Sequence, residues 1–122
     1  MKAARKLLKD DDDTLGNAAY NLHQCAEKAL KGYLVFKQTR INKTHDLELL
    51  VKLCIEIEQD FIALKEEVKQ LNPYATDSRY PDDYFKIDRT EVEEAILKTT
   101  KILNFVKKKI EKTSNPTLKI FS

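Results

Sequence analysis

Apolar residues recur at alternating spacings of four and three residues across positions 14–39. The repeated positions are Leu15, Ala19, Leu22, Ala26, Ala29, Tyr33 and Phe36, and Ala18, Cys25 and Leu30 widen the stripe on one flank. This heptad-like seam predicts one long amphipathic helix, about 37 Å long at ~1.5 Å per residue. A helix of that length can pack both on its own core and on a second subunit, and its small alanines allow close approach.

Shorter apolar stripes predict further helices. A short amphipathic stretch covers residues 2–9. The later stripes are Leu47, Leu50, Val51, Cys54 and Ile57; then Phe61, Leu64, Val68 and Leu71; and finally Val92, Ala95, Ile96, Thr99, Ile102, Leu103, Val106 and Ile110. We therefore predict an all-α fold, an up-and-down bundle of four to five helices. The bundle domain is expected over residues 1–112, with a C-terminal tail over 113–122 that is free or docks on a partner.

Helix-capping residues mark where two of these helices begin. Residues 40–44 break the periodicity, and Thr44 is predicted to cap the third helix with Asp46 in its first turn. Asp88 is predicted to cap the fifth helix, and Glu91 three residues later completes a capping-box-like pattern. A break near residues 59–60 separates the third helix from the fourth, which should stop before Pro73.

The segment 72–88 differs from the rest of the chain. Its sequence, NPYATDSRYPDDYFKID, holds two prolines, three tyrosines and a phenylalanine and has no helical periodicity. A long loop inside a compact domain is usually functional or disordered, and this aromatic content favours a packed loop. We predict a long aromatic and proline-containing loop before the last helix.

Composition agrees with a helical domain and limits the function. Of 122 residues only two are glycine and three are proline, which disfavours a turn-rich β fold. Twenty-two basic and twenty acidic residues leave a net charge of +2, without the basic excess of a dedicated nucleic-acid-binding protein.

The cysteines and the hydropathy pattern indicate the compartment. Cys25 and Cys54 lie on apolar stripes, so we expect buried free thiols in a reducing environment rather than a disulfide. No apolar run approaches the roughly 18 residues of a transmembrane helix, and the N-terminal residues lack the apolar core of a signal peptide. We expect a soluble, cytoplasmic protein that makes no membrane contact.

His45 and Arg40 are the first candidates for chemistry. The field at a helix N-terminus favours the neutral, base-competent imidazole at position 45. With Arg40 five positions earlier, the chain offers a base for a ribose 2′-hydroxyl and a cation for a phosphorane. The alternative is that His45 hydrogen-bonds locally to close the turn and Arg40 is simply exposed.

Two further groups of residues are candidates for ligand or metal binding. Arg79 and Tyr80, held by Pro81, could bind a phosphate and stack a base, or instead close the end of the bundle by packing. His23 and Glu27 lie four apart on the long helix, but two metal ligands without a third favour a structural role. We predict no metal and no cofactor, and the chain lacks a phosphate-binding glycine loop, a Cys-x-x-Cys pair and a serine nucleophile elbow.

Three stretches together resemble the HEPN family (higher eukaryotes and prokaryotes nucleotide-binding domain), in its small prokaryotic stand-alone form. They are HQCAEKALKGYL (23–34), KTHDLELL (43–50) and DSRYPD (77–82). The resemblance covers about residues 2–112. It implies a helical bundle that is usually a homodimer and is often encoded beside a minimal nucleotidyltransferase. Members range from metal-independent ribonucleases, including toxins, to nucleotide-binding and non-catalytic proteins.

The resemblance also implies roles for individual residues. Ribonuclease members carry an arginine, four to six further residues and then a histidine, a spacing that Arg40 and His45 meet. Residues expected to contact a ligand are Lys43, Asp46, Arg79 and Tyr80.

These observations favour a HEPN homodimer that binds a nucleotide or RNA phosphate in the cleft near its two-fold axis, with a nucleotidyltransferase as partner. Arg40 and Arg79 would hold phosphate, Tyr80 would stack a base, and His45 would be a base or hydrogen-bond donor. One alternative is a metal-independent endoribonuclease toxin neutralised by that partner. The other is a non-catalytic protein–protein interaction module, for which deep burial of His45 and Arg79 would argue.

Overall fold

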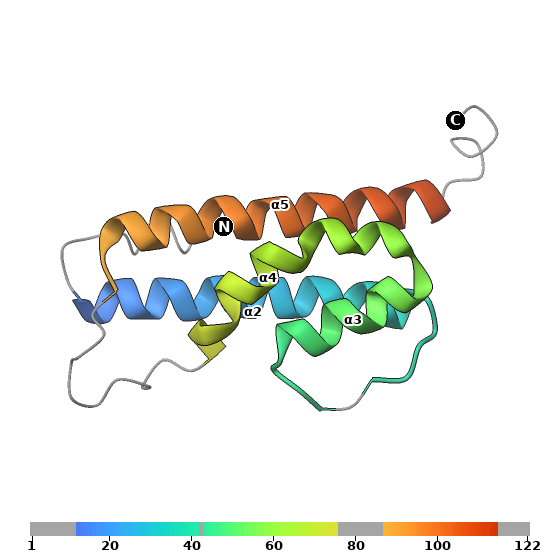
Figure 1. Ribbon diagram of the computed structural model, residues 1–122, viewed down its shortest axis with the longest axis horizontal. Helices are drawn as coiled ribbons and strands as arrows, with labels where there is room; N and C mark the ends of the chain where they lie inside the picture. Colours follow the sequence, from blue (N-terminus) through green and yellow to red (C-terminus); the bar gives the residue numbers. More distant parts are fainter. Residues whose placement is uncertain (1–11, 42, 76–86, 115–122) are drawn as a thin grey trace.

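A computed structural model describes residues 12–41, 43–75 and 87–114, and all regular structure within them is helical. Two long helices, α2 (Asp12–Phe36) and α5 (Arg89–Ser114), lie side by side (Figure 1). Four shorter elements pack against this pair: α3 (Leu47–Ile57), the 3₁₀ helix η1 (Gln59–Leu64), α4 (Lys65–Leu71) and the 3₁₀ turn η2 (Asn72–Ala75). The predicted all-α helical bundle is confirmed.

The connection from residue 37 to residue 46 runs back along the bundle, so α3 begins beside the middle of α2 (Figure 1). His45, just before α3, contacts Glu27, whereas Glu58, just after α3, accepts a hydrogen bond from Tyr33. Helices α2 and α3 therefore run in the same direction, and α4 returns antiparallel to α3. The predicted up-and-down order is wrong at this step, because the connection carries the chain back along α2 before α3 begins. The path of the connection between α2 and α3 therefore places the segment before α3 against the centre of α2.

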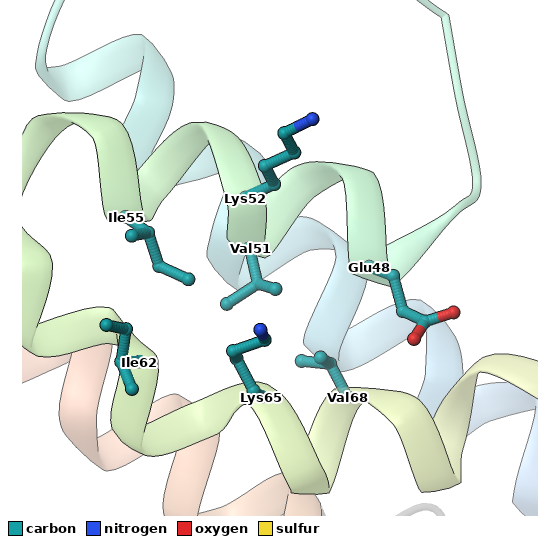
Figure 2. A pocket seen from close by; sticks show the side chains of 7 residues that line it. All are labelled: Glu48, Val51, Lys52, Ile55, Ile62, Lys65 and Val68. Atoms are coloured by element: carbon teal, nitrogen blue, oxygen red, sulfur yellow. The ribbon is translucent and has the colours of Figure 1, made fainter.

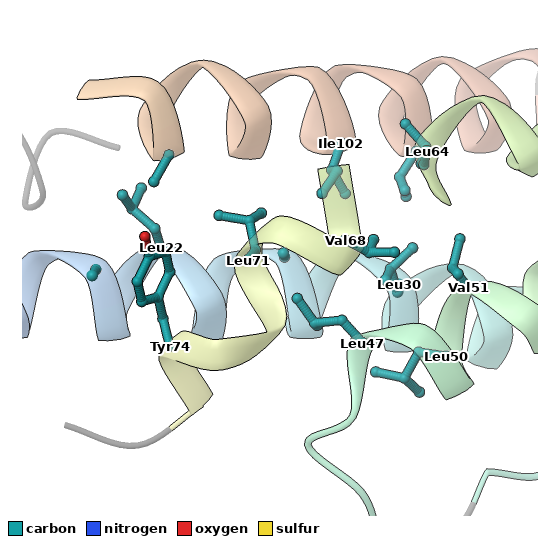
Figure 3. Packing of buried hydrophobic residues seen from close by; sticks show 14 of the residues in the cluster. Leu22, Leu30, Leu47, Leu50, Val51, Leu64, Val68, Leu71, Tyr74 and Ile102 are labelled. Carbon is teal, nitrogen blue, oxygen red and sulfur yellow. The ribbon is translucent and has the colours of Figure 1, made fainter. Parts of the chain in front are cut away.

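Apolar side chains from every described element form one core (Figure 3). Its aromatic centre joins Tyr33, Phe61 and Phe105, with ring centroids 4.5 Å apart for the first pair and 4.9 Å for the second. These three rings come from α2, η1 and α5, so the contact links elements that are distant in sequence. The first pair is tilted and the second is edge-to-face, and aromatic pairs stabilise a fold by about 0.5–1.5 kcal/mol beyond their buried area.

The α2 helix ends earlier than the predicted residue 39 because Gln38 takes a left-handed conformation, with φ 56°. The amide of Gln38 donates to the carbonyl of Val35, and the amide of Thr39 donates to that of Leu34, both at 2.8 Å. This pattern of bonds is a Schellman motif, which ends a helix by satisfying its last carbonyls. Glycine is the usual residue at the left-handed position. Because position 38 is a glutamine, the sequence did not indicate that the helix ends here.

The N-cap of α3 is Asp46, not Thr44 as predicted. The Asp46 carboxylate accepts from the amides of Glu48, at 3.0 Å, and Leu49, at 3.4 Å. The Thr44 hydroxyl instead accepts from the Asp46 amide at 3.0 Å, so it forms the turn before the cap. Aspartate and threonine compete for such positions, and the aspartate here stands closer to the apolar stripe.

The predicted cap of α5 is confirmed. Asp88 accepts from the amide of Glu91 at 2.7 Å. The Glu91 carboxylate, however, accepts from the Tyr74 hydroxyl at 2.7 Å and thereby ties η2 to the start of α5.

Most predicted stripe positions are buried, with a few exceptions. Ile57 is 36% exposed because α3 ends there and the chain turns into η1. The half-buried positions are Cys25, Ala29, Phe36, Leu103 and Ile110. Both cysteines are free thiols, and Cys54 alone is fully buried. Among the described helices, none combines the length and apolarity needed to cross a bilayer.

Several predictions fall on residues outside the described ranges. They are the short helix 2–9, most of the loop 72–88, and nearly all of the tail 113–122. As predicted, α4 ends before Pro73, at Leu71, and within the predicted loop Asn72–Ala75 forms a separate 3₁₀ turn.

Candidate functional site

A buried carboxylate on α2 holds the imidazole of His45. Nδ1 of His45 lies 2.9 Å from Oε1 of Glu27, and Nζ of Lys31 lies 2.9 Å from Oε2 of the same carboxylate. The Glu27 side chain is only 7% exposed, whereas that of His45 is 72% exposed. Since a carboxylate only accepts hydrogen bonds, this contact places a proton on Nδ1 and leaves Nε2 of the neutral ring as an acceptor.

Glu27 remains anionic in this environment. Burial alone would raise the pKa of Glu27, but the hydrogen bonds from Lys31 and His45 outweigh burial and lower it. The carboxylate therefore offers a permanent acceptor to His45 over the neutral pH range. A histidine oriented by a buried carboxylate is a common arrangement in sites that transfer protons or bind anions.

A second layer of hydrogen bonds fixes the backbone next to His45. The side-chain amide of Asn72, at the end of α4, accepts from the amide of Leu47 at 2.9 Å and donates to the Asp46 carboxylate at 3.0 Å. This pair of bonds joins the start of α3 to the α4–η2 junction. His45 is thus held through its ring by α2, while the two residues after it are held by Asn72.

His23 lies under this site and is fully buried. Its Nδ1 is 3.8 Å from Oε1 of Glu27, the oxygen that binds His45. Neither ring nitrogen makes a hydrogen bond within the described part of the chain. Burial lowers the pKa of His23, while Glu27, the His45 backbone and the Asn72 side chain oppose this shift only in part.

A family model described as HEPN domain matches residues 1–110. The chain belongs to the HEPN domain family. A comparison with curated proteins gave no match, and neither did a comparison with solved structures.

In this HEPN domain, the described candidates from the sequence lie in one connection and at the start of α3. Arg40 and Lys43 are exposed, as is His45. Asp46 caps α3, so its carboxylate oxygen is already committed to backbone amides and to Asn72. The predicted ligand residues Arg79 and Tyr80 lie outside the described residues.

Both sequence readings of His45 missed its actual contact. The bond to Glu27 spans 18 residues and is neither a local turn closure nor an interaction with Arg40. A signal was present on α2, where His23, Glu27 and Lys31 repeat every four residues and place polar groups within an apolar helix. The role of Asn72 had no such signal, because it depends on how α4 ends.

Among the described residues, no group of three or more histidine, cysteine, aspartate or glutamate side chains is arranged to bind a metal ion. A separate hollow of about 350 Å³ lies between α3 and the η1–α4 segment (Figure 2). Its lining residues are Glu48, Val51, Lys52, Ile55, Ile62, Lys65 and Val68. Since its walls are largely apolar and His45 is not among them, this hollow is distinct from the candidate site.

Proposed function

We propose that this HEPN domain binds a phosphate-bearing ligand, a nucleotide or RNA, at the exposed face of His45. The observation that carries the proposal is the Glu27–His45 contact of 2.9 Å, in which a buried carboxylate orients an imidazole that is 72% exposed. A structural histidine with no ligand to meet gains little from such exposure. In the neutral ring Nε2 can accept a hydrogen bond from a ribose hydroxyl, and in the protonated ring it can donate one to a phosphate oxygen.

Cationic side chains around His45 support this choice of ligand. Arg40 and Lys43 are exposed in the same connection, and Lys31 reaches the same Glu27 carboxylate from α2. Phosphate groups are bound in proteins mainly by arginine, lysine and backbone amides. Asn72 is the first residue of the segment 72–88, and its hydrogen bonds hold it beside Asp46 and Leu47. This contact supports a site that residues 40–46 share with Arg79 and Tyr80.

The assembly that we propose is a homodimer with this site near its two-fold axis, and a nucleotidyltransferase as its partner. Exposed apolar side chains on the long helices support a protein partner, since Val35 is 63% and Leu97 70% exposed. Light scattering of the purified chain tests the dimer, and a monomer at micromolar concentration contradicts it.

A nuclear magnetic resonance titration with AMP, and then with a short single-stranded RNA, tests the location of the site. We expect the largest shifts of backbone amides at residues 40–46 and around Glu27 and Lys31. Shifts centred on the exposed lysines of α5, or no shifts with either ligand at millimolar concentration, would contradict the proposal.

A second candidate function, metal-independent RNA cleavage, is favoured by the same carboxylate–imidazole pair. Nε2 of His45 would take the proton of a ribose 2′-hydroxyl, whose oxygen would attack the adjacent phosphorus. Arg40 would neutralise the phosphorane, and the 5′-oxygen would leave with a proton taken from water, giving a 2′,3′-cyclic phosphate. Cleavage of RNA in EDTA that is lost in both His45→Ala and Arg40→Ala would support this function, and cleavage that persists in both would contradict it.

Deep burial of His45 would have favoured the third candidate function, a non-catalytic interaction module. The exposure of that side chain gives no such support.

A further inference from the structure

Of the two histidines of the chain, His23 is the fully buried one, and the proposed function assigns it no role. Its neighbour Glu27 presents a single oxygen, Oε1, to two imidazoles, at 2.9 Å from Nδ1 of His45 and at 3.8 Å from Nδ1 of His23. The other oxygen, Oε2, is occupied by Lys31. The two histidines therefore share one acceptor oxygen, and in this arrangement only His45 lies within hydrogen-bond distance of it.

We propose that His23 is a positioning residue for His45, because its neutral ring leaves Glu27 to His45 and its protonated ring takes that carboxylate away. The inference rests on the proposed function only in giving the orientation of His45 a purpose. A buried imidazolium needs a charged or hydrogen-bonding partner, since an unpaired buried charge is costly. Glu27 is the nearest anion, and a movement of about 1 Å would bring it within hydrogen-bond distance of His23.

The surroundings of His23 leave few other partners. The titratable groups that act on it most strongly are Glu27 on its own helix and His45 in the segment before α3. Two neutral groups also lie beside it: the backbone of His45 and, from the α4–η2 junction, the side chain of Asn72, which is already bonded to Asp46 and Leu47. Neither carries a negative charge, so Glu27 is the anion among these neighbours. Lys31 is the remaining charged group on this carboxylate, and as a cation it cannot accept a proton from His23.

The burial of His23 sets the direction of the effect. Because burial lowers the pKa of His23 from its ordinary value of 6.5, the ring is neutral at pH 7 and gains its proton at a lower pH than an exposed histidine does. The Glu27–His45 contact should accordingly hold at neutral pH and loosen as the pH falls.

The chain has only two histidines, so ring nitrogens can be followed without ambiguity. Nitrogen-15 spectra of both rings are recorded on the free protein from pH 8 downward until the His23 ring has taken up its proton, for the wild type and for His23→Gln. We expect the His45 ring at pH 8 to carry its proton on Nδ1. On acidification the wild-type His45 signals should show two steps, one of which coincides with protonation of His23, and His23→Gln should lack that step.

A single His45 step in the wild type, or the same two steps in His23→Gln, would overturn the inference. If His23→Gln does not fold, Glu27→Gln replaces it; removal of the shared acceptor should likewise abolish the step that coincides with protonation of His23, and its persistence overturns the inference. No ligand is added in this experiment. A failure of the proposed function would appear in the AMP and RNA titrations instead and would leave this result unchanged.

Discussion

The carboxylate of Glu27 and the imidazole of His45 lie 2.9 Å apart, although 18 residues separate them along the chain. The contact exists because the connection after α2 runs back along the bundle and places the start of α3 beside the middle of α2. It converts an exposed histidine on a loop into a ring with a fixed tautomer and orientation. In a HEPN domain this is the feature of the described chain that is best suited to meet a phosphate or a ribose hydroxyl.

Substitution of Glu27 by glutamine should weaken ligand binding without unfolding the domain. The amide keeps the size of the side chain but removes the negative charge that fixes Nδ1–H of His45. We expect affinity for a short RNA to fall about three- to tenfold, in line with the loss of one charge-assisted hydrogen bond. Titration calorimetry measures the change, and Glu56→Gln, an exposed carboxylate on α3, serves as the matched control. Equal affinities for wild type and Glu27→Gln would show that the contact does not serve binding.

His23 should make the domain less stable in mild acid. Its pKa is lowered in the fold from a reference value of 6.5, so below pH 6.5 the unfolded chain binds more protons than the folded one. The contribution of a neutral His23 is thus present above pH 6.5 and is lost as the pH falls through the folded value. Urea unfolding between pH 7 and pH 5 measures this slope, and His23→Gln should flatten it. The carboxylates titrate from reference values of 4.5 and 3.8, below this window. An unchanged slope in the variant would exclude His23 as its source.

Glu58 joins three helices, and Tyr33→Phe tests its contribution to stability. The hydroxyl of Tyr33 donates to Glu58, and Nζ of Lys109 lies 3.1 Å from the same carboxylate. Burial would raise the pKa of Glu58, but these two partners outweigh burial and lower it. We expect Tyr33→Phe to reduce the free energy of unfolding by about 1 kcal/mol. Tyr20→Phe on the same helix is the control, and an equal effect of the two changes would argue against a specific bond.

Gln38→Gly should stabilise the domain. Gln38 has φ 56°, a conformation that costs a residue with a side chain about 1–2 kcal/mol and glycine very little. Part of that gain is offset by the greater freedom of glycine in the unfolded chain, so we expect an increase of about 0.5–1 kcal/mol. Thermal unfolding measures the increase. Gln70→Gly, inside α4, should instead lower stability by about 1 kcal/mol. A loss of stability in Gln38→Gly would contradict the Schellman geometry at the end of α2.

The fold could be predicted from the sequence because its helices are strongly periodic. The stripe from Leu15 to Tyr33 and the cap at Asp88 are local patterns, and both are found in the structure. The errors concern helix ends, where a non-glycine residue at position 38 and two competing caps at positions 44 and 46 gave no clear local signal.

The candidate site was predicted only in part, for a physical reason. His45 and Arg40 could be selected as residue types suited to phosphate chemistry, but the partner of His45 depends on the path of the connection between α2 and α3. Glu27 was considered only as a metal ligand with His23, and Asn72 was not considered at all. Their roles arise from tertiary contacts over 18, 25 and 26 residues, which periodicity and spacing do not encode.

The proposed binding requires that the exposed imidazole of His45 contacts a phosphate-bearing ligand. Fluorescence polarisation of a labelled single-stranded RNA, compared between wild type and His45→Ala, tests it most directly, with Lys108→Ala on α5 as a control for general charge effects. We predict that His45→Ala weakens binding about tenfold or more and that Lys108→Ala changes it less than twofold. Binding that is equal in wild type and His45→Ala, or that falls as much in Lys108→Ala, would contradict the claim.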